Sequence, residues 1–270
     1  MTAIDFSGFV DRLAQASAEV ILPFFRSAIG AEDKSAGGAF DPVTEADRAA
    51  EVAMRRLIAQ AFPAHGVIGE EYGAERADAE YVWVLDPIDG TKSFISGLPT
   101  WGTLIGLMHR GRPVYGMMSQ PFTRERYFGD GASAGWRGPT STGQSPRGDS
   151  GSRALHVRPC AALAEATLMT TSPQMFDIAE TPAYRRVEDK VRLARYGADC
   201  YGYCVLAAGL IDIVIEASLK PHDIVALVPI VEGAGGIVTT WTGDDPAQGG
   251  RIVAAGDKRL HAEALQLLAM

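Results

Sequence analysis

A short apolar run that ends in two acids is the feature that most constrains this chain. Residues 81–85 (Tyr-Val-Trp-Val-Leu) have the length and composition of a buried strand, and Asp86-Pro87-Ile88-Asp89 follows directly. Pro87 stiffens the backbone and removes a donor, so we expect a turn there. Two carboxylates leaving one strand repel each other unless a cation lies between them. Because no Cys or His pair is near, hard oxygen ligands favour Mg²⁺, Ca²⁺ or Mn²⁺ over zinc.

The next two residues also suit a ligand site. Gly90 permits a close approach or an unusual backbone angle, and Thr91 supplies a hydroxyl where a helix can begin. Backbone N–H groups at a helix start bind phosphate oxygens. The competing interpretation is a strand, a turn and a helix whose acids are merely solvated, because acids are common in turns.

Three more segments carry acids. They are Thr44 and Asp47, in capping-box spacing before an expected helix; Glu70 and Glu71, after the apolar run 66–69; and Asp223, at the expected N-cap of a late helix. For Glu70 or Asp223 taken alone, a helix cap or a surface acid is the favoured interpretation. Their order along the chain, together with the Asp-Pro-Ile-Asp-Gly-Thr run, makes a joint role the stronger interpretation.

This ordered set resembles the inositol monophosphatase superfamily of metal-dependent, lithium-sensitive phosphatases. The resemblance covers nearly the whole chain, and residues 86–106 look most like the histidinol-phosphatase branch. It implies a layered α-β-α-β-α sandwich, of mixed α+β and α/β character, usually paired as a homodimer. It also implies two or three Mg²⁺ ions per site, with Mn²⁺ as a possible substitute.

The same resemblance implies roles for individual residues. The metal ligands would be Glu70, Asp86, the Ile88 carbonyl, Asp89 and Asp223. Gly90 and Thr91 would bind phosphate, and the catalytic group would be Glu70, Thr91 and Asp47, with the first two acting on the attacking water and Asp47 orienting Thr91. Glu71 would be either an outer acid or a ligand of a third, weak metal site. No Ser, Cys or His nucleophile is needed, since metal ions can acidify a water.

Substrate contacts are expected from Asp199 and Glu216, which lie where the family touches the organic part of its substrate. Two acids there would suit a cationic leaving group such as the amine of histidinol. The alternative interpretation is that each acid is a helix cap or an exposed acid with no role in substrate binding. Lys34 matches a basic residue of the family only with altered spacing around residues 36–40.

Composition narrows the partners. The chain of 270 residues is 47% hydrophobic and 21% charged, which is typical of a soluble globular protein, and its net charge of −8 disfavours nucleic acid and anionic membranes as partners. Three cysteines form no zinc pattern and favour a reduced, cytoplasmic protein. No apolar run reaches membrane-spanning length, and the early Asp5 argues against a signal peptide.

Periodicity predicts two halves, 1–140 with most of the metal ligands and 150–270 with Asp223 and the substrate contacts. We expect helices near 6–24 and 44–62, then strands near 66–69, 81–85, 103–109, 113–119 and 126–130. The second half should alternate strands near 168–171, 192–196, 211–216 and 237–240 with helices near 182–188, 200–208 and 224–233. The polar stretch 138–153 between them is either an interdomain linker or a loop within one domain.

The leading hypothesis is a Mg²⁺-dependent phosphatase that hydrolyses a small phosphate monoester, histidinol phosphate, in histidine biosynthesis. An inositol-1-monophosphatase or a broad sugar-phosphate phosphatase is the alternative. A non-enzymatic cation-binding or regulatory protein is disfavoured, because binding alone needs no water-activating pair such as Thr91 and Glu70.

Overall fold

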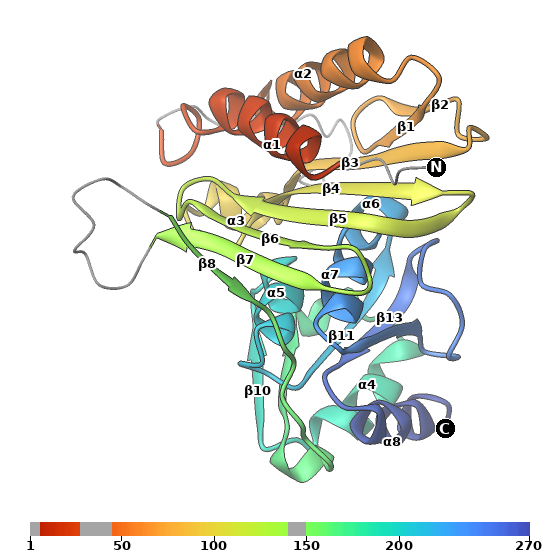
Figure 1. Ribbon diagram of the computed structural model, residues 1–270. Helices are drawn as coiled ribbons and strands as arrows, with labels where there is room; N and C mark the ends of the chain where they lie inside the picture. Colours follow the sequence, from red (N-terminus) through yellow and green to blue (C-terminus); the bar gives the residue numbers. More distant parts are fainter. Residues whose placement is uncertain (1–5, 28–44, 140–149) are drawn as a thin grey trace.

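The computed structural model describes residues 6–27, 45–139 and 150–270, so Lys34 and Thr44 lie outside the described residues. Helices and two sheets stack in five alternating layers (Figure 1). One outer layer holds α1 (Ser7–Ile21) and α2 (Glu45–Ala61), the central layer holds α5 (Tyr201–Ala207), α6 (Pro221–Ile224) and α7 (Leu227–Gly233), and the other outer layer holds α4 (Glu180–Glu188) and α8 (Lys258–Leu268). The predicted α-β-α-β-α sandwich is therefore confirmed.

The first sheet has eight strands in the order β2-β1-β3-β4-β5-β6-β7-β8. They are β1 (Gly66–Gly69), β2 (Gly73–Glu75), β3 (Tyr81–Asp89), β4 (Gly102–His109), β5 (Arg112–Gln120), β6 (Glu125–Gly129), β7 (Ala134–Pro139) and β8 (Ser150–Ala154). Only β1 and β3 pair in parallel; the other neighbours are antiparallel. The two strands that carry the acids thus end at the same edge of the sheet.

The second sheet has five strands in the order β10-β9-β11-β13-β12. They are β9 (Thr167–Thr170), β10 (Leu193–Tyr196), β11 (Ile213–Leu219), β12 (Ile237–Thr240) and β13 (Gly250–Ala255). Short 3₁₀ turns at Leu163–Glu165 and Pro173–Met175 flank β9, and α3 (Thr91–Ile95) follows β3. β2, β7, β8, β13 and α8 were not predicted. β2 is fully exposed, and β7 and β8 are rich in Gly, Pro and Ser, so their hydrophobic periodicity is weak.

Apolar side chains fill the space on both faces of each sheet. Trp83, Leu85 and Ile105 pack under α1 and α2, and Trp241 belongs to the cluster beneath α8. Trp101 and Trp241 are buried as well. All three cysteines are buried and free. No helix in the described part of the chain is both long and apolar enough to cross a membrane.

One local prediction is wrong. Residue 87 was expected to end the strand in a turn, but β3 continues to Asp89, and its pairing with β4 shifts register between Asp86 and Asp89. A proline is tolerated inside a strand at such an irregularity, where no ladder bond is lost. The bulge sets the directions in which Asp86 and Asp89 leave the strand.

The polar stretch near the middle of the chain lies between paired strands. β7 and β8 pair antiparallel, with Pro139 opposite Ser150, so both described flanks belong to the first sheet. Residues 140–149 lie outside the described residues. The first sheet therefore receives a strand from beyond the predicted boundary at residue 150.

Candidate active site

Parallel pairing brings the first two acidic segments together. Gly69 of β1 lies opposite Leu85 of β3, and the Glu70 N–H donates to the Leu85 carbonyl oxygen at 3.2 Å. Glu70 therefore begins its loop beside Asp86. Since carboxyl ends of parallel strands share a sheet edge, two segments 16 positions apart deliver their acids to one place.

Asp223 joins this edge from the central layer. It is the third residue of α6, its carboxylate accepts the Lys220 N–H at 2.6 Å, and its own N–H donates to the Lys220 carbonyl oxygen at 3.1 Å. The predicted N-cap position is thus wrong by three residues, because Lys220 is the N-cap. Two overlapping sets of potential metal ligands result: one joins Glu70, Asp86 and His222, the other Asp86, Asp89 and Asp223. Within each set the ligand atoms lie within 4.8 Å of one another.

Crowding of these acids changes their proton affinity. Burial, followed by the charges of Glu70, Asp89 and Asp223, raises the pKa of Asp86 well above its usual range. Burial and the charges of Asp223 and Asp199 do the same to the pKa of Asp89. The Glu70 side chain keeps contact with solvent, yet the atoms packed around its carboxyl group desolvate it enough to raise its pKa to about 7. Among the residues that the structure describes, positive charge therefore does not balance these carboxylates.

A divalent cation would supply the missing positive charge. The Oδ1 atom of Asp86 is buried and has no hydrogen-bond donor among the described residues. A buried anionic oxygen without a donor is costly, and a cation would satisfy it. Four carboxylates are the hard donors that Mg²⁺ and Mn²⁺ accept, so the residues present fit such an ion.

His222 is the potential ligand that the sequence did not single out. Its Nε2 atom lies 3.6 Å from Asp223 Oδ1, and the residue belongs to the set with Glu70 and Asp86. In the sequence it is one of five scattered histidines, and only its position next to Asp223 could have drawn attention to it.

The start of α3 closes one side of the site. Gly90 is its N-cap and has φ 86° and ψ 41°, a left-handed conformation that glycine adopts without strain. A Cβ atom there would lie 2.9 Å from Cβ and Cγ of Asp199. Gly90 therefore combines the unusual backbone angle and the close approach that the sequence suggests as alternative reasons for a glycine here. Thr91 begins the helix, and its Oγ1 donates to the Ile88 carbonyl oxygen at 3.3 Å.

Asp199 is held against this helix start. Its backbone has a left-handed φ of 47°, and its Oδ2 accepts the Ser93 hydroxyl at 2.5 Å. Thr100 Oγ1 donates in turn to Ser93 Oγ at 3.0 Å. The next residue, Cys200, donates its N–H to Asp89 Oδ2 at 2.7 Å. Residues 199 and 200 thus connect Asp199, the expected substrate acid, to Asp89, an expected metal ligand.

Glu216 is a further buried acid. It is buried on β11, where Oε1 accepts the N–H and hydroxyl of Thr171 at 3.0 and 2.6 Å and Oε2 accepts the Tyr203 hydroxyl at 3.0 Å. Burial raises its pKa to about 7 despite these donors. The charge of Asp199 contributes to that shift, which puts the two acids in the same electrostatic environment.

Asp47 and Glu71 surround the cluster. Asp47 is buried in the first turn of α2, and its charge contributes to the raised pKa of Asp86. Glu71 pairs with Arg48 Nε at 3.2 Å, and its side chain is buried. The structure therefore brings together the expected acids from α2, β1, β3, Asp199 and α6.

The fold and these carboxylate sets define a layered α/β protein with a potential divalent-metal site. The family model described as the inositol monophosphatase family matches residues 7–269. The chain is 43% identical to the bifunctional phosphatase IMPL2, chloroplastic, of Arabidopsis thaliana, over 97% of this chain and 75% of that protein. It is 34% identical to a histidinol-phosphatase of Mycobacterium tuberculosis, over 84% of each chain.

A solved structure agrees. An inositol monophosphatase from Zymomonas mobilis superposes with a TM-score of 0.84 at 38% identity, covering 99% of this chain and 100% of that one. The chain belongs to the inositol monophosphatase family and is a phosphatase of that family.

Proposed function

We propose that this protein is a Mg²⁺-dependent phosphate monoester hydrolase that acts on histidinol phosphate. The observation that carries the proposal is the convergence of Glu70, Asp86, Asp89 and Asp223 at one sheet edge, beside a helix start and with an unsatisfied buried carboxylate oxygen. Such a site attracts cations and, through them, a phosphate.

The proposed chemistry is in-line hydrolysis by water. Bound Mg²⁺ would lower the pKa of a water and neutralise charge on the transferring phosphoryl group. Glu70, Asp86, the Ile88 carbonyl, Asp89 and Asp223 would hold the ions, with His222 beside them. Gly90 and Thr91 would place backbone N–H groups toward the phosphate, while the Thr91 hydroxyl and the Glu70 carboxylate orient the attacking water. Asp47 would support this arrangement from α2.

The substrate preference is proposed from Asp199. Its carboxylate is fixed by Ser93 and lies against the start of α3, where the phosphate would bind, so an organic group on that phosphate would be within reach of it. Glu216 provides a second acid in the same environment. A substrate ammonium would gain a charge-assisted hydrogen bond worth about 1.5–3 kcal/mol, which a neutral polyol cannot match.

The relatives support both substrates. One curated relative is a histidinol-phosphatase, and the well-matched solved structure is an inositol monophosphatase. Hydrolysis of inositol 1-phosphate is therefore the second candidate. We also propose a reduced, cytoplasmic setting, supported by the three free thiols, and a homodimer as the family resemblance implies.

A phosphate-release assay on both substrates tests the proposal. We expect the wild type to prefer histidinol phosphate about ten- to a hundredfold in kcat/KM, because about 1.4 kcal/mol corresponds to a factor of ten. Asp199→Asn should reduce that preference by harming the cationic substrate. Excess chelator, or Asp86→Asn, should abolish turnover of both.

Equal wild-type kcat/KM values on the two substrates, or parallel losses in Asp199→Asn, would refute the preference for histidinol phosphate. The protein would then be an inositol-phosphate phosphatase or a general phosphatase. Full turnover in excess chelator would remove the metal mechanism altogether.

A further inference from the structure

The loop that carries Glu70 is wrapped around a buried carboxylate from another layer. Glu70, Glu71 and Tyr72 connect β1 to β2, and Gly69 pairs with Gly73 across this short hairpin. Glu51 of α2 reaches into the loop: its Oε2 accepts the Glu71 N–H at 2.7 Å and its Oε1 accepts the Tyr72 N–H at 3.2 Å. With the Glu70 N–H bound to Leu85, three successive amides of the loop have fixed acceptors.

The backbone of the hairpin lies directly against this carboxylate at Gly69. A Cβ atom on Gly69 would lie 2.0 Å from Glu51 Oε1, so only glycine allows the backbone to approach the carboxylate. Glu51 itself is fully buried. It lies one helical turn after Asp47, and two acids at that spacing repel each other in a helix. A buried acid in this position therefore needs compensating partners.

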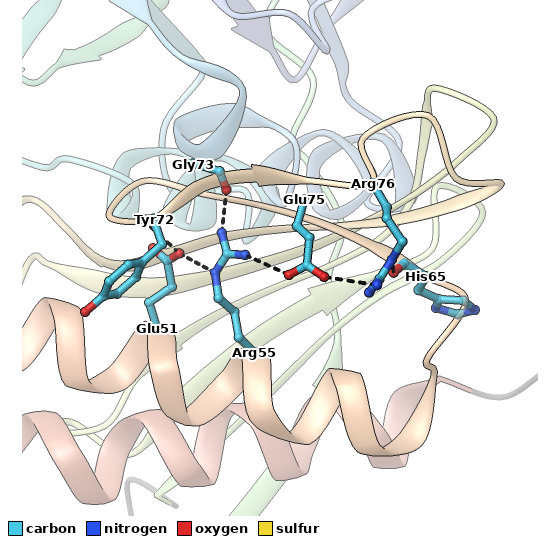
Figure 2. A network of polar contacts seen from close by, with 7 residues as sticks. All are labelled: Glu51, Arg55, His65, Tyr72, Gly73, Glu75 and Arg76. Carbon is cyan, nitrogen blue, oxygen red and sulfur yellow. Dashed lines mark hydrogen bonds and ion pairs between the residues drawn. The ribbon is translucent and has the colours of Figure 1, made fainter.

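Arg55 provides that compensation and extends the contact along the hairpin. Its Nε lies 2.6 Å from Glu51 Oε1, one helical turn away, and its Nη2 donates to the Gly73 carbonyl oxygen. Figure 2 shows the Arg55 guanidinium lying between Glu51 and the exposed Glu75, with Arg76 beyond it. Three successive residues after Glu70, at positions 71–73, are thus hydrogen-bonded to α2.

We propose that Glu51, held by Arg55, is a positioning residue that sets the place of Glu70 in the metal site. The inference rests on the proposed function only in taking Glu70 as a metal ligand. Glu51 accepts from the two amides that directly follow Glu70, and it acts by fixing them. Its charge is also close enough to contribute to the raised pKa of Glu70. Groups that orient metal ligands from outside typically change metal affinity by about 10- to 100-fold when altered.

Glu51→Gln tests this role, because glutamine keeps the shape but places an NH₂ group where one loop N–H needs an acceptor. The matched control is Glu75→Gln, which makes the same change on an exposed acid that also faces Arg55, at 3.9 Å. Mg²⁺ affinity is measured by calorimetry, and the Mg²⁺ concentration for half-maximal phosphate release is measured alongside. In Glu51→Gln we expect the Mg²⁺ affinity to fall about tenfold and the Mg²⁺ concentration for half-maximal release to rise about tenfold. In Glu75→Gln both quantities should stay within about twofold of the wild type.

A structural role alone predicts a different result, namely a lower melting temperature with unchanged Mg²⁺ affinity in the folded protein, and that result would overturn the proposal. If Glu51→Gln does not fold, Arg55→Lys decides, because lysine keeps the charge but cannot bridge Glu51 and Gly73; unchanged Mg²⁺ affinity there also overturns the proposal. A wild type that binds Mg²⁺ but releases no phosphate refutes the proposed function, while calorimetry still decides the role of Glu51. A wild type that binds no Mg²⁺ refutes both.

Discussion

Thr91 occupies the point where metal site and phosphate site would meet. Its side chain is partly buried, and its hydroxyl donates to the Ile88 carbonyl oxygen, which is itself an expected metal ligand. A hydroxyl donates only one proton but can accept two hydrogen bonds. Thr91 Oγ1 therefore retains acceptor capacity for a water bound beside the phosphate, which is the role we propose for it.

Thr91→Ala should separate chemistry from binding. Removing the hydroxyl is expected to lower kcat about 10²-fold, because a group that orients the attacking water acts mainly in the transition state. Mg²⁺ affinity should change little, since no carboxylate is lost. Thr91→Ser keeps the hydroxyl and should recover most of the rate. Loss of calorimetric Mg²⁺ binding in Thr91→Ala, with kcat unchanged at saturating metal, would contradict this assignment.

The junction of β3 and α3 is the element on which the site depends. The bulge between Asp86 and Asp89 interrupts the ladder before its last pair, Asp89 with Gly102, and the left-handed Gly90 then turns the chain into the helix within one residue. The same glycine lets Asp199 approach the backbone. Strand, bulge and helix start therefore place metal ligands, phosphate donors and the substrate acid side by side.

Gly90→Ala tests this junction against Gly111→Ala. Both glycines have positive φ, 86° and 79°, but only at Gly90 would the new Cβ meet Asp199; at Gly111 it would meet nothing within 4 Å. Each substitution should cost about 1–2 kcal/mol of backbone strain, measured as the free energy of unfolding in urea. Gly90→Ala should destabilise further and should also reduce kcat/KM. Equal stability losses in the two variants would show that the Asp199 contact carries no energy.

At the scale of the whole molecule, the fold buries more acid than it neutralises. Asp86, Asp89 and Glu216 all have raised pKa values, with burial as the first cause in each. Folding therefore favours their protonated forms. Stability from such groups is present at low pH and is lost as the pH rises through the folded-state pKa, unless a cation compensates.

Glu216→Gln isolates one of these groups. The pKa of Glu216 rises from an ordinary 4.5 to about 7, so its contribution to stability should decline between roughly pH 4.5 and pH 7, by about 3 kcal/mol at 1.36 kcal/mol per pKa unit. Glutamine stays neutral and can still accept from Thr171. The free energy of unfolding, measured in urea with chelator from pH 5 to pH 8, should fall more steeply for the wild type than for the variant. Parallel curves would mean that Glu216 titrates normally.

Strong periodicity and strand-end acids were enough to predict much of this protein. The helices at 7–21 and 45–61 and the strand at 66–69 lie where hydrophobic spacing placed them, because each buries one face or a whole short run. Segments with little apolar content, such as 73–75 and 150–154, were missed, since pairing with a neighbour rather than their own composition makes them strands.

The sequence by itself determined which residues are acidic, which strands they follow, and that Gly90 is needed after them. Only the tertiary structure decided that Glu70, Asp86 and Asp223 meet, because parallel pairing of β1 with β3 and the position of α6 are long-range choices. It also decided that His222 lies beside the acids and that Glu51 reaches across a layer into the Glu70 loop. These contacts join residues from 16 to more than 150 positions apart, and local propensities carry no information about such distances.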